Sequence, residues 1–200
     1  MWRYGFALSI LILCGCSSTP PLVWDLSEAN TKAPTAMVAR KLERPLYIVL
    51  DARVPDRWQL DQPERKVTLE GFHSFVTRDL KAALAPYFTE VVIVNDKAGL
   101  PSKPHAVVEV AVDDVKLHYL DAGEKLKSGL EMRWSVAARM GEASDFAFTY
   151  SGRAVSREEN TSFQQATVQM TEAAILALMK KWNEADVPEK LRTWTQPEAK

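Results

Sequence analysis

Apolar and polar residues alternate most regularly over residues 130–140, where apolar side chains occupy every even-numbered position. Because successive side chains of a strand point to opposite faces, this pattern predicts a strand with one buried face. A short turn containing Gly141 follows, and residues 145–156 return with a second alternating set. The two stretches therefore predict an antiparallel hairpin that covers a core.

Three further stretches predict strands. The short runs 46–53 and 91–94 are rich in β-branched residues, which favours buried strands. The longer run 106–120 keeps its apolar residues on one parity as far as Asp113 and Asp114 and on the opposite parity afterwards. A strand keeps its faces only at period two, so this change predicts a β-bulge at the two aspartates.

Apolar residues recur at steps of three and four in two other stretches, which predicts amphipathic helices. The first helix is expected to begin near Thr68, a candidate N-cap, and to end near Pro86. The second is expected to run from about Thr161 to Trp182. Between the first strand and the first helix, the polar segment 56–66 is expected to be a loop.

The predicted order of elements is therefore β-α-β-β-β-β-α. We expect an α+β fold, a two-layer sandwich of one mostly antiparallel sheet of about five strands with both helices on one face. The first two strands are joined through a helix, so we expect them to pair in parallel through a right-handed crossover.

These elements define a globular domain over residues 45–183. The preceding residues 16–44 are rich in Ser, Thr, Asn and Pro, which predicts a flexible tether. Within this segment the apolar residues Leu22–Trp24 leave an alternative open, in which they dock on the domain. Residues 184–200 are expected to form a C-terminal tail whose last residues are loose, with a single turn around Leu191–Trp194.

Residues 1–15 have the form of a signal peptide. Arg3 precedes an apolar run that is shorter than the ~20 residues a membrane-spanning helix needs. This run ends in Leu-Cys-Gly-Cys, which resembles the lipobox of bacterial lipoproteins. The resemblance implies cleavage before Cys16, a thioether-linked diacylglycerol on its sulfur and an acyl chain on its new amino group. Ser17 after it implies sorting to the outer membrane. An ordinary cleaved signal or a short anchor is the alternative.

Composition adds two restrictions. The formal net charge is −1 and apolar residues make up 46% of the chain, so the sequence favours a real core and carries no basic field for nucleic acid. Its two cysteines, Cys14 and Cys16, lie in the signal and at the lipidation position. The mature domain therefore has neither a disulfide nor a thiol nucleophile.

No arrangement of reactive residues points to catalysis. None of His73, His105 and His118 has a second histidine or cysteine at metal-ligand spacing, so we expect surface or rim histidines and no metal. Asp113 and Asp114 are neighbours on a strand and point to opposite faces, so they do not converge on one substrate. We therefore expect a protein that is not an enzyme and has no cofactor besides the lipid on Cys16.

Three tryptophans are candidate interface residues. Trp24 lies in the tether, Trp58 in the expected loop and Trp194 in the tail. An exposed tryptophan can anchor a protein interface or lie at a membrane surface. The alternative is that each packs beneath its own loop, since scattered exposed apolar residues are normal.

The order of elements resembles that of a group of small bacterial envelope lipoproteins. The group includes the YajG-type lipoproteins, the LPS-assembly lipoprotein and the PqiC-type auxiliary lipoproteins of lipid-transporting ABC systems, with the CsgG and TolB N-terminal-like domains. The similarity spans most of the mature chain and is one of pattern. The stretches that carry it are CSSTPP from Cys16, and residues 46–58, 78–94, 130–157 and 169–182.

This resemblance implies a lipoprotein anchored in the outer membrane on its periplasmic side. Two functions remain: a non-catalytic assembly or adaptor subunit that contacts an envelope protein, or an auxiliary component that binds a lipid or glycan between helices and sheet. Phe72, Phe75, Phe163 and Met170 are large enough to fill that space. They favour a packed core, and hence binding at the surface.

Overall fold

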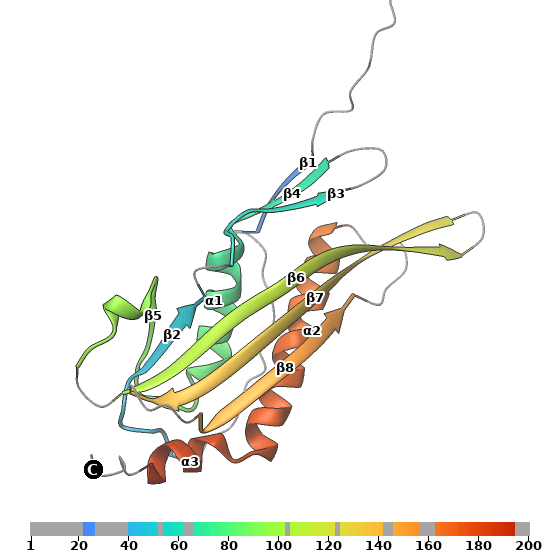
Figure 1. Ribbon diagram of the computed structural model, residues 1–200. Coiled ribbons are helices and arrows are strands. Elements are labelled where there is room, and N and C mark those ends of the chain that lie inside the picture. The colour runs from blue at the N-terminus through green and yellow to red at the C-terminus, as the bar shows by residue number, and fades with distance from the viewer. Residues whose placement is uncertain are drawn as a thin grey trace, which may run out of the picture.

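The computed structural model describes residues 22–26, 40–51, 54–61, 66–102, 105–122, 125–141, 146–156 and 163–194. Its main body is a five-stranded sheet with two long helices on one face, which confirms the expected α+β sandwich (Figure 1). The strands follow the order β5-β2-β6-β7-β8. Their bounds are β2 Leu46–Leu50, β5 Val91–Val94, β6 Ala106–Ala122, β7 Lys125–Met140 and β8 Phe148–Val155, and the helices are α1 Phe72–Leu84 and α2 Phe163–Glu184.

Strand β2 lies inside the sheet and pairs in parallel with both β5 and β6. The β2–β5 pairing is the parallel pair expected from the intervening helix. After β5 the chain passes through a short 3₁₀ turn, η1 (Lys97–Gly99), and returns on the other side of β2 as β6. Since β6, β7 and β8 pair antiparallel, the sheet is mixed, with two of its four pairings parallel.

The predicted bulge is confirmed in the long β6–β7 hairpin. Its register shifts between Val112 and Asp114. Val112 and Val115 are both buried although they are three positions apart, which a regular strand does not allow. The hairpin continues past the last paired residue of β2, Leu50, as Figure 1 shows.

A second, three-stranded sheet was not predicted. It consists of β1 Leu22–Asp25, β3 Trp58–Asp61 and β4 Lys66–Glu70, in the order β1-β4-β3, and we call it the small sheet. The expected loop over 56–66 and the helix start at Thr68 are therefore wrong. Antiparallel pairing places Leu60 opposite Val67 and buries both. The chain turns from β4 into α1 at Gly71, whose φ of 72° favours glycine.

Strand β1 lies within the segment expected to be a tether and corresponds to the docked alternative. It pairs in parallel with β4 over four residues. Next to it, the Leu26 N–H donates to the Glu70 carbonyl at 2.9 Å, and the Leu26 side chain is fully buried. Cys16 and the rest of residues 1–21 and 27–39 lie outside the described residues.

Large side chains fill the space between helices and sheet. Phe72 and Phe75 of α1 and Met170 and Trp182 of α2 have no exposed surface, and Trp134 of β7 is 2% exposed. Trp182 makes edge-to-face contacts with Tyr87 and Phe148, at centroid distances of 6.5 and 5.5 Å. The side chain of Phe163, also expected here, lies outside the description. The core is packed as the sequence predicts.

Beyond α2 the chain forms a further helix, α3 (Val187–Thr193), where the sequence predicted a single turn. Its Val187 and Leu191 side chains are buried against the core. None of the helices in the described ranges is both long and apolar enough to cross a membrane.

Candidate functional site

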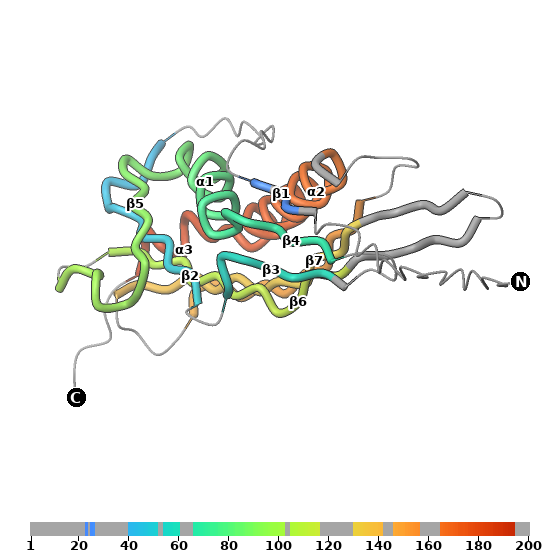
Figure 2. Tube along the Cα trace, turned by 90° about the horizontal axis from the view of Figure 1, so that it is seen from above, coloured from blue at the N-terminus to red at the C-terminus, as the bar shows by residue number. Residues whose placement is uncertain are grey.

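The face of the large sheet opposite the helices is concave and, within the described part of the chain, no helix covers it (Figures 1 and 2). A hollow of about 540 Å³ crosses this face from β8 to the end of β5, and we call it the open-face hollow. The strand register places one row of its residues side by side on four strands. That row consists of Val49, Glu109, Ala137 and Thr149.

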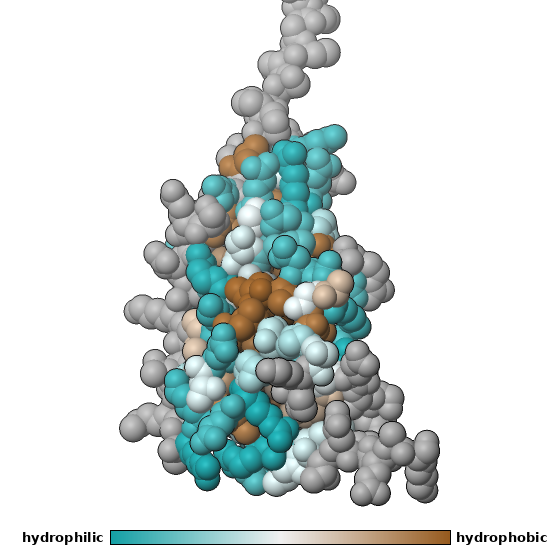
Figure 3. Space-filling model, turned by 90° about the vertical axis from the view of Figure 1, so that its left-hand side faces the viewer, coloured by the Kyte–Doolittle hydropathy of each residue, from teal (hydrophilic) through white to brown (hydrophobic). Residues whose placement is uncertain are grey.

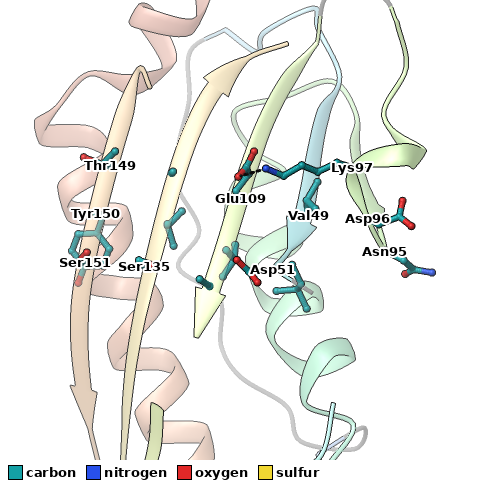
Figure 4. A pocket seen from close by; sticks show the side chains of 15 residues that line it. Val49, Asp51, Asn95, Asp96, Lys97, Glu109, Ser135, Thr149, Tyr150 and Ser151 are labelled. Carbon is teal, nitrogen blue, oxygen red and sulfur yellow. Dashed lines mark ion pairs between the residues drawn. The ribbon is translucent and has the colours of Figure 1, made fainter. Parts of the chain in front are cut away.

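Small side chains explain the depth of this hollow. A second row of neighbours consists of Ala111, Ser135 and Ser151, again one residue from each adjacent strand. At the positions that alternate with these two rows, β6, β7 and β8 carry larger apolar residues, such as Val110, Val136 and Phe148, which face the helices. The open face is therefore hollow because the alternate positions that face it carry small side chains, as the close view in Figure 4 shows.

The η1 turn closes one side of the open-face hollow. The Asp96 carboxylate accepts a hydrogen bond from the Gly99 N–H at 3.1 Å, which caps the turn. Lys97 extends from this turn across to β6, where its Nζ lies 3.0 Å from Glu109 Oε2 (Figure 4). An ion pair thus joins the turn to the floor of the hollow.

Glu109 is the centre of charge in this part of the site. Arg139 Nε and a terminal guanidinium nitrogen lie 3.0 and 2.8 Å from its Oε1, while Lys97 contacts Oε2. Partial burial raises the pKa of Glu109, but hydrogen bonds from Lys97 and Arg139 and their positive charges outweigh it, so the pKa is lowered. Glu109 is therefore ionised at neutral pH and holds two cations at the rim.

A second charged cluster lies further along the same face. Glu131 of β7 is only 2% exposed and accepts hydrogen bonds from Arg133 at 3.1 Å and Arg153 at 2.5 Å. The hydrogen bond to Glu131 raises the pKa of Arg153. Alternation in the sequence placed Glu131 on the polar face, and the structure adds that it is buried there by its arginine partners.

His73 and His105, the two histidines whose side chains the structure describes, make separate contacts. His105, expected at the surface or rim, is instead 3% exposed and makes an edge contact with Tyr47 at 5.1 Å, which corrects that expectation. His73 Nε2 is hydrogen-bonded to the Val54 carbonyl, and the side chain of His118 lies outside the description. In the described ranges, no three His, Cys, Asp or Glu residues are grouped to hold a metal ion.

The edge of the large sheet at β5 is a second exposed feature. Ile93 of β5 is 39% exposed. Between β5 and α1 lies a smaller hollow of about 410 Å³, lined by Ile93, Leu50, His73 and Thr77 among others. Figure 3 looks onto the side of the molecule that carries β5 and shows an apolar patch surrounded by polar surface. Both hollows reach Leu50 and Asp51 at the end of β2, so they adjoin.

The small sheet places Trp24 and Trp58 on strands to either side of Leu69, whereas Trp194 follows α3. Trp58 is half-buried and packs edge-to-face on Phe72 at 5.9 Å, and Trp194 is half-buried against the core. They lie at opposite ends of the molecule, in β3 and after α3 (Figure 1). The side chain of Trp24 lies outside the description. Their observed contacts are with the core, and a role in binding a partner stays a prediction.

Comparison with known proteins adds information about the fold. No family model matches the sequence, and no curated protein matches it. The fold is similar to the crystal structure of a Xanthomonas campestris protein of family DUF330, with a TM-score of 0.59 and 9% identity over 84% of this chain and 97% of that one. A hemagglutinin homolog from Helicobacter pylori matches at a TM-score of 0.36 and 9% identity, over 78% and 95% of the two chains. At 9% identity the first likeness shows a shared fold alone, and the second does not reach that level.

Proposed function

We propose that this protein is an auxiliary lipoprotein of the bacterial envelope, anchored through Cys16 in the outer membrane and facing the periplasm. It acts as a non-catalytic assembly or adaptor subunit that binds a protein partner on the open face of its sheet. The observation that carries this proposal is the contrast between a filled helix side and an uncovered, concave opposite side.

The filled core disfavours a ligand between the helices and the sheet. Phe72, Phe75 and Met170 have no exposed surface there, so that space holds side chains. By contrast, the open-face hollow offers small apolar and hydroxyl side chains, with the ion pair of Lys97 and Glu109 on one side. An apolar centre with a polar rim is typical of a protein interface.

Two further observations support the envelope assignment. The Leu-Cys-Gly-Cys sequence that ends at Cys16 has the form of a lipobox. The shared fold with a DUF330 protein agrees with the resemblance of the sequence to PqiC-type and YajG-type lipoproteins.

The hollow itself supports an alternative, in which the protein is an auxiliary component of lipid transport and binds a lipid or glycan. Its volume of about 540 Å³ lies in the range of small-molecule sites. In this alternative the ligand binds on the open face of the sheet, because the space beneath the helices is filled.

The test compares the variants Ala137→Arg and Leu176→Arg. Ala137 lies in the floor of the hollow, whereas Leu176 is 55% exposed on α2, on the other side of the molecule. Each variant is cross-linked in cells and extracted from the membrane, and its partners and its own intact mass are determined by mass spectrometry. We expect Ala137→Arg to lose the partner, Leu176→Arg to keep it, and both to carry the acyl groups on Cys16.

Other results would exclude parts of the proposal. Loss of a co-extracted lipid or glycan from Ala137→Arg, with no protein partner in the wild type, would establish the alternative. Equal partner recovery from both variants would exclude the open face as the site. An unmodified Cys16 in the wild type would exclude the lipid anchor.

A further inference from the structure

The position of β1 limits how far the folded body can lie from its anchor. Leu22, the first residue of β1, is six residues after Cys16. An extended chain spans at most ~3.6 Å per residue, so these six residues reach ~20 Å. If β1 were not docked, the first fixed residue would be Leu42, which pairs with Phe88, and twenty-six residues would reach ~90 Å. Docking of β1 therefore shortens the available tether about fourfold.

The attachment of β1 is well defined. Four residues pair with β4, from Leu22 opposite Val67 to Asp25 opposite Glu70. Leu26 continues the strand with its hydrogen bond to Glu70 and a fully buried side chain. Because the pairing is parallel, the starts of β1 and β4 lie together at one end of the small sheet.

The small sheet lies at one end of the molecule and α3 at the other (Figure 1). Helix α2 runs from the small-sheet end to α3, and its 22 residues correspond to ~33 Å at 1.5 Å per residue. The two ends of the body are therefore separated by more than the reach of the short tether.

We propose that the small sheet is the membrane-facing end of the protein and that the lipid bilayer holding Cys16 covers it. This inference rests on the lipid anchor of the proposed function. Six residues of tether bring the start of β1 to the bilayer surface and leave α3 directed into the periplasm.

The experiment measures energy transfer from one labelled position to acceptor-labelled lipid headgroups. Cys14 is removed with the signal and the Cys16 sulfur is in a thioether, so an introduced cysteine is the only free thiol. The donor is placed at Lys66→Cys, at the exposed start of β4, or at Lys190→Cys, exposed on α3. The acylated protein is reconstituted in phosphatidylethanolamine–phosphatidylglycerol vesicles. We expect strong transfer from position 66 and loss of most of it at position 190.

A matched pair of proline variants tests whether β1 sets this distance. Alternate residues of a strand direct their N–H groups to the same side, and the Leu26 N–H faces β4. The Trp24 N–H therefore also faces β4, and the Val23 N–H faces away. Trp24→Pro removes a donor from the pairing, whereas Val23→Pro does not. We expect Trp24→Pro to reduce transfer from position 66 toward the value at 190, and Val23→Pro to leave it unchanged.

Three results would overturn the inference, and a fourth would count against the anchor instead. Equal transfer from positions 66 and 190, on a chain whose mass shows acylated Cys16, would exclude a fixed orientation. Greater transfer from 190 would reverse it. Unchanged transfer in Trp24→Pro, with circular dichroism like that of the wild type, would show that β1 does not set the distance. A mass without acyl groups would remove the proposed anchor itself.

Discussion

The two faces of the large sheet are made by the same strands and differ in almost every property. On β8, Phe148 is buried and contacts Trp182 of α2, while the next residue, Thr149, is exposed and lines the open-face hollow. One face carries large apolar side chains beneath helices, and the other carries small and charged ones. The side chains that stabilise the core and those that we propose to bind a partner therefore lie on opposite sides of the same strands.

The comparison also shows that the open face is not merely unused surface. Glu109 and Glu131 each hold two basic side chains in place, at 3.1 Å or less. These pairs fix long side chains on the open face, while Ala111, Ser135 and Ala137 line the hollow between the strands. A surface with fixed side chains has less rotamer entropy to lose when a partner binds.

The largest expected effect distinguishes the two faces at neighbouring residues. Phe148→Ala removes a buried ring from its contact with Trp182, and we expect a loss of about 3 kcal/mol in the free energy of unfolding. Thr149→Ala, one residue further on the open face, is expected to change it by less than about 0.5 kcal/mol. Urea unfolding followed by tryptophan fluorescence measures both. Similar losses for the two variants would show that the open face also carries the fold.

A smaller effect is expected where the open face does bury a group. Glu131→Gln removes the charge from two hydrogen bonds to arginine, so we expect a loss of about 1–2 kcal/mol. Both arginines are more than half exposed and can be solvated in its place, which keeps the loss moderate. Glu43→Gln is the control, because Glu43 is 83% exposed in its ion pair with Arg40. If Glu131→Gln and Glu43→Gln lower the free energy of unfolding in urea by the same amount, the burial of Glu131 makes no contribution to stability.

The smallest effect depends on pH. The folded-state pKa of Glu109 lies below its ordinary value of 4.5, so its stabilising contribution is present above that pH and is lost as the pH falls through the lowered pKa. We expect Glu109→Gln to be less stable than the wild type by about 0.5–1 kcal/mol at pH 7, since the pair is partly exposed. The difference should shrink below pH 4.5. Thermal unfolding at a series of pH values measures it, and a difference that persists at pH 3 would contradict the ion-pair account.

The sequence predicted the elements whose patterns are long. Alternation through Met132 and Trp134 identified the buried face of β7, and the change of parity at Asp113 and Asp114 identified the bulge. Steps of three and four gave both long helices and their large core residues. In these stretches the apolar residues of the repeating pattern are the buried ones, because each element buries one continuous row of side chains.

The small sheet was missed because its strands are short. Trp58–Leu60 and Val67–Leu69 each offer a single alternation, which is too little to distinguish a strand from a loop or a helix start. One signal was present in the sequence: two apolar pairs flank a polar segment that contains Pro63, and Gly71 then separates β4 from α1. A predicted hairpin followed by a helix would have accounted for the two apolar pairs and for Gly71.

The candidate site could not be predicted because its residues carry no chemical signature. Ser135 and Ala137 become parts of a hollow only through the register that aligns β7 with β6 and β8. Burial of Glu131 similarly requires Arg153, which lies on another strand. Pairing between distant segments creates these features, and a pattern within one segment does not reveal it.

The pairing of β1 with β4 has a consequence for the order of folding. Leu22 and its partner Val67 are separated by 45 positions, so β1 can pair only after β4 is available and has formed its own hairpin with β3. The need to close this loop delays the pairing of β1. Because β1 has only four residues and is paired on one side, it also opens more readily than the core. With the lipid anchor that we propose on Cys16, the folded body would first move on a long tether, and pairing of β1 would then bring it close to the anchor.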